Sequence, residues 1–141
     1  MLTRRDWATK YAWSFIGVPY HWGGDDPMEG FDCSGFCIEI LRSVGVLSRF
    51  GDWTAHDLWV HFQGSRTSQP DEGCLVYWWG NSGSRIVHIE YCLNDKYSLG
   101  ASGGGSSTTN MESAIRSNAY IKMRPFMYRS GVAGFTDPFN E

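Results

Sequence analysis

Phe31-Asp32-Cys33-Ser34-Gly35-Phe36 lies where a glycine- and aromatic-rich loop gives way to a run with apolar residues at helical spacing. The sulfur of Cys33 is therefore expected at the N-terminus of a helix, which Gly45 is expected to end. Unpaired N–H groups and the positive end of the helix dipole stabilise negative charge at that place. Cys33 is accordingly predicted to react as a thiolate, the nucleophilic form of cysteine.

The other elements also follow from spacing. Capping-box patterns at Thr3 and Thr54 precede apolar residues at helical spacing and predict a first helix and a short third one, while Asn110 is expected to cap a brief helix. From Gly73 onward, short runs rich in β-branched and aromatic residues predict consecutive antiparallel strands. These runs are residues 74–79, 86–93, 97–102 and 119–124. Helices followed by strands favour an α+β domain.

The chain of 141 residues has the length of one domain. We expect residues 1–129 to form that single domain and residues 130–141 to form a C-terminal tail. A net charge of -3 offers no basic surface for nucleic acid. No apolar run approaches the roughly 18 residues of a membrane span, and the N-terminus lacks the apolar stretch of a secretory signal.

Four cysteines, Cys33, Cys37, Cys74 and Cys92, could form two disulfides or none, and their spacing does not choose between these states. The missing secretory signal favours reduced thiols, and the last three are expected to be small buried apolar residues. No C-x-x-C pair predicts a zinc site, and no G-x-x-x-x-G-K loop predicts a nucleotide site. We therefore expect no metal, nucleotide or flavin cofactor.

His88 and Glu90 share one face of the second predicted strand, because side chains alternate between the two faces of a strand. A helix that delivers a thiolate and a strand that delivers an imidazole can form a catalytic pair, here Cys33 and His88. His88 would take the thiol proton and later pass it to the leaving amine. For a lone histidine, filling a half-buried strand position is the simpler role.

Four segments carry a resemblance to a known family. They are Gly17-Val18-Pro19-Tyr20-His21-Trp22-Gly23-Gly24, Phe31-Asp32-Cys33-Ser34-Gly35-Phe36, Gly73-Cys74-Leu75-Val76-Tyr77 and His88-Ile89-Glu90-Tyr91. In this order they resemble the NlpC family of papain-like bacterial cell-wall cysteine peptidases, over roughly residues 3–124. The resemblance implies a papain-like α+β fold, with the nucleophile at the N-terminus of a helix packed on a central antiparallel sheet. It also implies hydrolysis of amide bonds in peptidoglycan stem peptides, in many members between D-glutamate and the diamino acid.

The resemblance further implies roles for single residues. Cys33 resembles the nucleophile and His88 the general base, and Tyr20 resembles a tyrosine that lines the cleft. Asp32 and Ser34 resemble the pair that reads the free amine and a carboxylate of the stem peptide. From the residues alone, Asp32 could equally be the N-cap of the helix, and Tyr20 an aromatic residue packed within its loop.

The sequence departs from the family pattern at Gly100, where the next strand usually presents a His, Asn or Gln that orients the catalytic imidazole. Glycine has no side chain for this role, and loss of the orienting residue weakens a triad to a dyad. Glu90, Ser98, Ser102, a backbone carbonyl or a water could replace it. Glu90 is favoured because a carboxylate best stabilises an imidazolium, although side chains two residues apart on a strand diverge.

Three functions stay open at this point. The first is a cysteine peptidase or amidase that cuts peptidoglycan peptides through an acyl-enzyme on Cys33. The second, suggested by Gly100, is a catalytically weak or inactive module that binds cell-wall peptides, and the third is a papain-like amidase or transferase acting on another amide. A compact chain without an export signal favours a phage tail or lysis component that acts on the bacterial wall, with a secreted effector that uses a non-classical route as the alternative. We expect a monomer.

Overall fold

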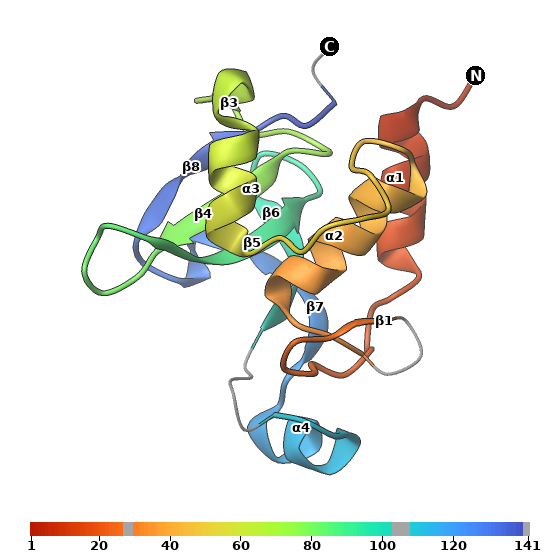
Figure 1. Cartoon of the computed structure of the whole chain (residues 1–141), viewed down its shortest axis with the longest axis vertical. Coiled ribbons are helices and arrows are strands. Elements are labelled where there is room, and N and C mark those ends of the chain that lie inside the picture. The colour runs from red at the N-terminus through yellow and green to blue at the C-terminus, as the bar shows by residue number, and fades with distance from the viewer. Residues whose placement is uncertain (27–29, 103–107, 140–141) are drawn as a thin grey trace.

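The computed structural model describes residues 1–26, 30–102 and 108–139, and these residues form a six-stranded antiparallel sheet with the first three helices on one side and the last helix apart from that face (Figure 1). The helices are α1 (Arg4–Trp13), α2 (Cys33–Ser43), α3 (Ala55–His61) and α4 (Met111–Ser117), with the 3-10 turns η1 (Gln63–Ser65) and η2 (Phe126–Tyr128). The sheet has the order β3-β8-β4-β5-β6-β7. Its strands are β3 (Arg66–Thr67), β4 (Leu75–Trp79), β5 (Ile86–Cys92), β6 (Tyr97–Ser102), β7 (Tyr120–Pro125) and β8 (Val132–Thr136). The short strands β1 (Asp25–Asp26) and β2 (Gly30–Phe31) pair separately.

The helices begin where the capping patterns predict. In α1, the Asp6 N–H donates to Thr3 Oγ1 at 3.2 Å and the Thr3 N–H donates to Asp6 Oδ2 at 2.8 Å. The same reciprocal pair opens α3 at Thr54 and Asp57. These bonds satisfy N–H groups that the first turn of a helix leaves without partners. Both helix starts predicted from the capping patterns are therefore confirmed.

Helix α2 lies at the centre of the core because its apolar side faces the sheet. Its residues Phe36, Ile40 and Leu41 are fully buried and pack with residues of β4, β5 and β6. On the opposite face of the sheet, the fully buried Trp78 lies in a second cluster with Phe126 of η2. Strand β4 is thus covered on both faces, which explains its continuous apolar sequence.

Of the expected C-terminal tail, the structure describes residues 130–139, and it places β8 inside the sheet, between β3 and β4. The hydroxyls of Tyr77 and Thr136 are 2.8 Å apart in the buried interior. At Gly134 an added Cβ would lie 3.2 Å from the Trp59 ring, so the strand passes close beneath that tryptophan. A short strand with a central glycine has little alternation of apolar and polar residues to reveal it in the sequence. Its strand conformation is determined by pairing with the neighbouring strands. Strand β3 likewise lies in a polar segment, residues 65–72, where the sequence predicts no strand.

Strands β5 and β6 pair at one end only. The recorded pairs involve Tyr91 and Cys92 of β5, whereas β6 pairs with β7 over all six of its residues. The two strands therefore separate toward His88. The N-terminus of α2 meets β5 at this end, since Cys33 interacts with His88.

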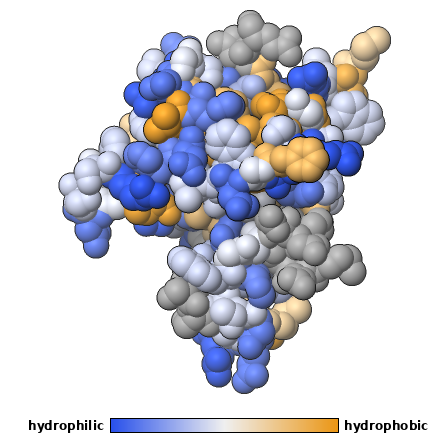
Figure 2. Space-filling model, in the orientation of Figure 1, coloured by the Kyte–Doolittle hydropathy of each residue, from blue (hydrophilic) through white to orange (hydrophobic). Residues whose placement is uncertain are grey.

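The face that carries the helices shows apolar residues in separate groups surrounded by polar ones (Figure 2). The large apolar side chains exposed to solvent include Trp7, Trp22 and Phe50. Among the described residues, none of the helices has both the length and the apolar character needed to span a bilayer.

Candidate active site

Cys33 is the first residue of α2 because Asp32 caps the helix. The Oδ1 atom of Asp32 accepts a hydrogen bond from the Gly35 N–H at 2.7 Å, and its Oδ2 atom accepts one from the Gly23 N–H at 3.1 Å. One carboxylate thus fixes both the helix start and the preceding loop. The Cys33 side chain is partly exposed, whereas the other three cysteines are buried and all four are free thiols. The predicted helix-terminal position of Cys33 and the predicted burial of the other cysteines are confirmed.

The loop of residues 17–24 is held between β7 and α2. The Tyr20 N–H donates to the carbonyl of Ala119, next to β7, at 2.9 Å. On the other side, a Cβ at Gly35 would overlap the carbonyl oxygen of Gly24. The loop can therefore approach the helix this closely because residue 35 is glycine. These two attachments place Tyr20 at the start of α2.

Tyr20 is buried beside Cys33 and Asp32. Burial raises the pKa of the Tyr20 hydroxyl, and the charges of Cys33 and Asp32 raise it further. The hydroxyl therefore stays protonated at neutral pH. A protonated phenol beside the sulfur can donate a hydrogen bond to a negatively charged oxygen in the cleft.

His88 lies on β5 with only 5% of its surface exposed, and its ring centre is 5.0 Å from that of Trp78. Burial alone would lower the pKa of His88, but hydrogen-bonding and charge interactions with Cys33 and Glu90 outweigh burial and raise the pKa to about 9. The Nε2 atom lies 2.6 Å from Glu90 Oε2. The Nδ1 atom is therefore the ring nitrogen that faces Cys33.

Glu90 is 1% exposed, and both of its carboxylate oxygens accept hydrogen bonds. Oε1 accepts from the Ser98 hydroxyl at 2.7 Å, and Oε2 accepts from the Tyr128 hydroxyl at 2.8 Å while also contacting His88. Burial alone would raise the pKa of Glu90, but the bonds with His88, Ser98 and Tyr128 outweigh it and lower the pKa. Glu90 is therefore ionised, and a buried carboxylate stabilises the protonated form of His88.

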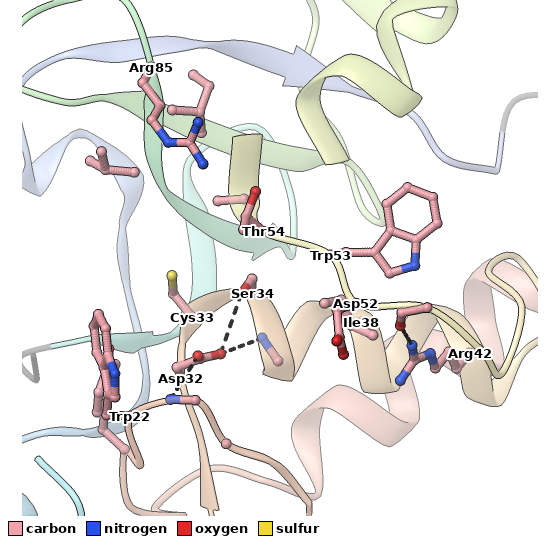
Figure 3. A pocket seen from close by; sticks show the side chains of 18 residues that line it. Trp22, Asp32, Cys33, Ser34, Ile38, Arg42, Asp52, Trp53, Thr54 and Arg85 are labelled. Atoms are coloured by element: carbon pink, nitrogen blue, oxygen red, sulfur yellow. Dashed lines mark hydrogen bonds between the residues drawn. The ribbon is translucent and has the colours of Figure 1, made fainter. Parts of the chain in front are cut away.

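The Cys33 sulfur faces a cleft of about 510 Å³ (Figure 3). Trp22, Asp32 and Ser34 line the wall around the start of α2, and Arg85 reaches toward the cavity from the opposite wall. Among the described residues, none forms a hydrogen bond with the Arg85 guanidinium. The cleft therefore carries a carboxylate on one wall and a guanidinium on the other, a pattern that suits a substrate with both charges.

All predicted site residues lie together. Four of them line the cleft: Tyr20, Asp32, Cys33 and Ser34. His88 interacts with Cys33, and Glu90 contacts His88. Sequence reasoning missed Tyr128 and Arg85. Tyr128 follows β7, Arg85 precedes β5, and neither lies in a recognisable motif. The side chain of Ser102, one of the alternatives for the orienting residue, lies outside the described part of the chain. Within that part, no group of three or more His, Cys, Asp or Glu could hold a metal ion.

Comparison with known families decides the relationship of this chain. The model of the NlpC/P60 family matches residues 17–125. The chain belongs to the NlpC/P60 family. The matched range includes the nucleophile segment, the histidine strand and the loop before them. The resemblance predicted from four short segments is thereby confirmed.

Two relatives within the NlpC/P60 family are named as endopeptidases. The probable endopeptidase p60 of Listeria grayi is 32% identical over 96 residues, which are 68% of this chain and 18% of the relative. The bifunctional muramidase/DL-endopeptidase CwlT of Bacillus subtilis is 27% identical over 106 residues, which are 74% of this chain and 31% of the relative. The chain thus spans less than a third of the length of these two relatives.

Solved structures of the NlpC/P60 family share the fold. A family protein from Bacillus cereus superposes with a TM-score of 0.73 at 19% identity, covering 94% of this chain and 39% of that one. The NlpC/p60 domain of the peptidoglycan hydrolase SagA gives a TM-score of 0.65 at 24% identity, covering 94% and 97%. The predicted α+β, papain-like architecture is therefore confirmed.

Proposed function

We propose that this chain is a cysteine peptidase that hydrolyses amide bonds in peptidoglycan stem peptides through an acyl-enzyme on Cys33. The observation that carries the proposal is the alignment of three side chains. The partly exposed Cys33 interacts with the buried His88, and His88 Nε2 contacts Glu90 at 2.6 Å. A nucleophile, a base and a group that holds the base are the parts that covalent amide hydrolysis requires.

The reaction follows from the position of each proton. The Cys33 thiol gives its proton to Nδ1 of His88, and the thiolate attacks the substrate carbonyl to form a carbon–sulfur bond. The backbone N–H of Cys33 at the helix start and the Tyr20 hydroxyl donate hydrogen bonds to the resulting oxyanion. His88 then protonates the leaving amine as the carbon–nitrogen bond breaks, which leaves a thioester on Cys33. A water that His88 deprotonates hydrolyses the thioester and frees the sulfur.

The walls of the cleft favour an amino-acid substrate with separated charges. The Asp32 carboxylate caps α2, but its negative charge also borders the cleft and can hold a free amine next to Ser34. The Arg85 guanidinium on the opposite wall can bind a carboxylate (Figure 3). A stem peptide carries an amine and a carboxylate close to the bond between D-glutamate and the diamino acid. We assign this bond as the one cut.

The structure offers less support for a catalytically weak binding module. That alternative was suggested by Gly100, which leaves the usual orienting position without a side chain. In the structure, Glu90 contacts His88 from the same strand, so the histidine does not lack a partner. A phage or lysis setting and a monomeric state stay predictions.

The test is digestion of defined muropeptides, with product masses measured by mass spectrometry. The wild-type protein should release products cut between D-glutamate and the diamino acid, and Cys33→Ala should release none. Cys74→Ala serves as the matched control, because Cys74 is buried away from the cleft and should not be needed. Cleavage that persists in Cys33→Ala would refute the assignment, and products cut at another amide would correct the bond.

A further inference from the structure

The contact between His88 and Glu90 is unusual for two residues on one strand. Side chains two positions apart on a strand leave the backbone roughly 7 Å from each other and nearly in parallel. The 2.6 Å contact between His88 Nε2 and Glu90 Oε2 therefore needs the glutamate to bend along the strand. A flexible side chain holds such a bend only where its surroundings fix it.

Gly100 on β6 provides the space for this bend. Because Tyr91 pairs with Leu99, Gly100 is the β6 residue that faces Glu90 where the two strands separate. A Cβ at Gly100 would overlap Cγ and Cδ of Glu90 and would lie 2.9 Å from its Oε1. Any larger residue at position 100 would therefore displace the glutamate side chain from its present path.

Ser98 and Tyr128 fix the end of the bent side chain. Ser98 donates to one carboxylate oxygen at 2.7 Å, and Tyr128 donates to the other at 2.8 Å. Bonds to both oxygens prevent rotation of the carboxylate. Tyr128 is itself held by the Arg124 guanidinium, which lies 3.7 Å from the centre of its ring.

We infer that Ser98, Gly100 and Tyr128 form a cradle that positions Glu90, and through it His88, for the reaction. None of the three touches the cleft, so they are positioning residues rather than catalytic ones. The cradle joins β6 to η2, which lies in the segment just before β8. The C-terminal part of the chain thus takes part in catalysis through Tyr128. This inference rests on the proposed peptidase function for its kinetic consequences only.

The test uses three substitutions in the cradle, two control substitutions and two measurements. Tyr128→Phe and Ser98→Ala each remove one hydroxyl, and Gly100→Ala fills the space of the bend. Tyr97→Phe and Gly64→Ala are matched controls, because Tyr97 is exposed and a Cβ at Gly64 meets nothing within 4 Å. The measurements are kcat and KM on a muropeptide, and the NMR resonance of the His88 Nε2 proton in protein labelled with ¹⁵N-histidine.

We expect kcat to fall about tenfold in Tyr128→Phe and Ser98→Ala and about 100-fold in Gly100→Ala, with KM within about twofold. The His88 Nε2 proton resonance should shift in the first two variants and be lost in Gly100→Ala. Both controls should keep the wild-type kcat and resonance. Wild-type values of kcat and of the resonance in Tyr128→Phe would overturn the inference, and this variant answers the question even if Gly100→Ala does not fold.

A double substitution separates the cradle from general damage to the fold. If Gly100→Ala acts by displacing Glu90, it should change kcat by less than about twofold in a Glu90→Ala background. An undiminished loss in that background would contradict the inference. If the wild-type protein cleaves no muropeptide, the proposed function fails, whereas the NMR resonance still decides whether the cradle positions His88.

Discussion

His88 Nε2 and Glu90 Oε2 lie 2.6 Å apart although the two residues stand on the same strand. This buried contact, together with the interaction between His88 and Cys33, raises the pKa of His88 to about 9 against the effect of burial. At neutral pH the imidazole is therefore protonated. An imidazolium backed by a carboxylate, next to the partly exposed Cys33, is the partner that a nucleophilic sulfur needs in the proposed reaction.

Glu90→Gln should weaken the activity and change its pH dependence. In the wild-type protein, kcat/KM should fall on the alkaline side near pH 9, because the imidazolium loses its proton there. A neutral amide stabilises the imidazolium less, so the alkaline limb should move to lower pH and kcat should fall by about 100-fold. Glu112→Gln, on the exposed surface of α4, is the control. An unchanged alkaline limb in Glu90→Gln would contradict the role of Glu90.

The stability of the protein should depend on pH through His88. Its pKa is raised in the folded state from 6.5 to about 9, so folding favours the protonated form. The resulting stabilisation is fully present below about pH 6.5 and is lost as the pH rises through about 9. Urea unfolding at several pH values should show this loss in the wild-type protein and a smaller one in His88→Gln. Equal pH dependence of the two proteins would contradict the raised pKa.

Asp32 should have two separable roles. Asp32→Asn can keep the cap of α2 but loses the charge and the bond from the Gly23 N–H, so the free energy of unfolding should fall less than in Asp32→Ala, while KM for a substrate with a free amine rises. Asp32→Ala should raise KM and also lower the free energy of unfolding by about 1 kcal/mol. Thr3→Ala, which removes the cap of α1, should lower stability similarly without changing KM. A wild-type KM in Asp32→Asn would leave Asp32 with the capping role alone.

Arg85 should determine the preference for a substrate carboxylate. Arg85→Ala removes the guanidinium from the cleft wall, so KM should rise about tenfold with kcat nearly constant. The same variant should bind a substrate analogue whose carboxylate is amidated as well as the wild-type protein does. Arg49→Ala removes another arginine as a control. If Arg85→Ala raises KM equally for the substrate and for its amidated analogue, Arg85 does not bind the carboxylate.

Removal of the chain after Arg129 should unfold the protein. Strand β8 lies between β3 and β4, and its loss would uncover Tyr77 and the β4 edge. A chain that ends at Phe139 is the control and should fold normally. Circular dichroism and thermal unfolding measure the result. A cooperative transition in the shorter chain would show that residues 130–139 are dispensable after all.

Local patterns in the sequence were sufficient to predict much of this structure. The helix start at Cys33 depends on Asp32 next to it, and the shared face of His88 and Glu90 depends on the two-residue period of a strand. Strand β8 was missed because its position comes from pairing with β4, more than fifty residues earlier in the chain. Tyr128 was missed for the same reason, since only the folded chain brings its hydroxyl to Glu90.

Gly100 illustrates why the site could not be derived completely. In the sequence, a glycine at this position suggested that the imidazole lacks a partner. In the folded chain, the absence of a side chain there admits Glu90 from the neighbouring strand. Sequence reasoning can note that a side chain is missing, but only packing shows which neighbour uses the space.

The most direct test of the central claim is the detection of the acyl-enzyme. The protein is mixed with a muropeptide, quenched in acid within the turnover time, and digested for mapping by mass spectrometry. The account predicts that the acyl half of the substrate is attached to Cys33 and that no adduct forms in Cys33→Ala. Product release without any adduct on Cys33, or with the adduct on another residue, would contradict it.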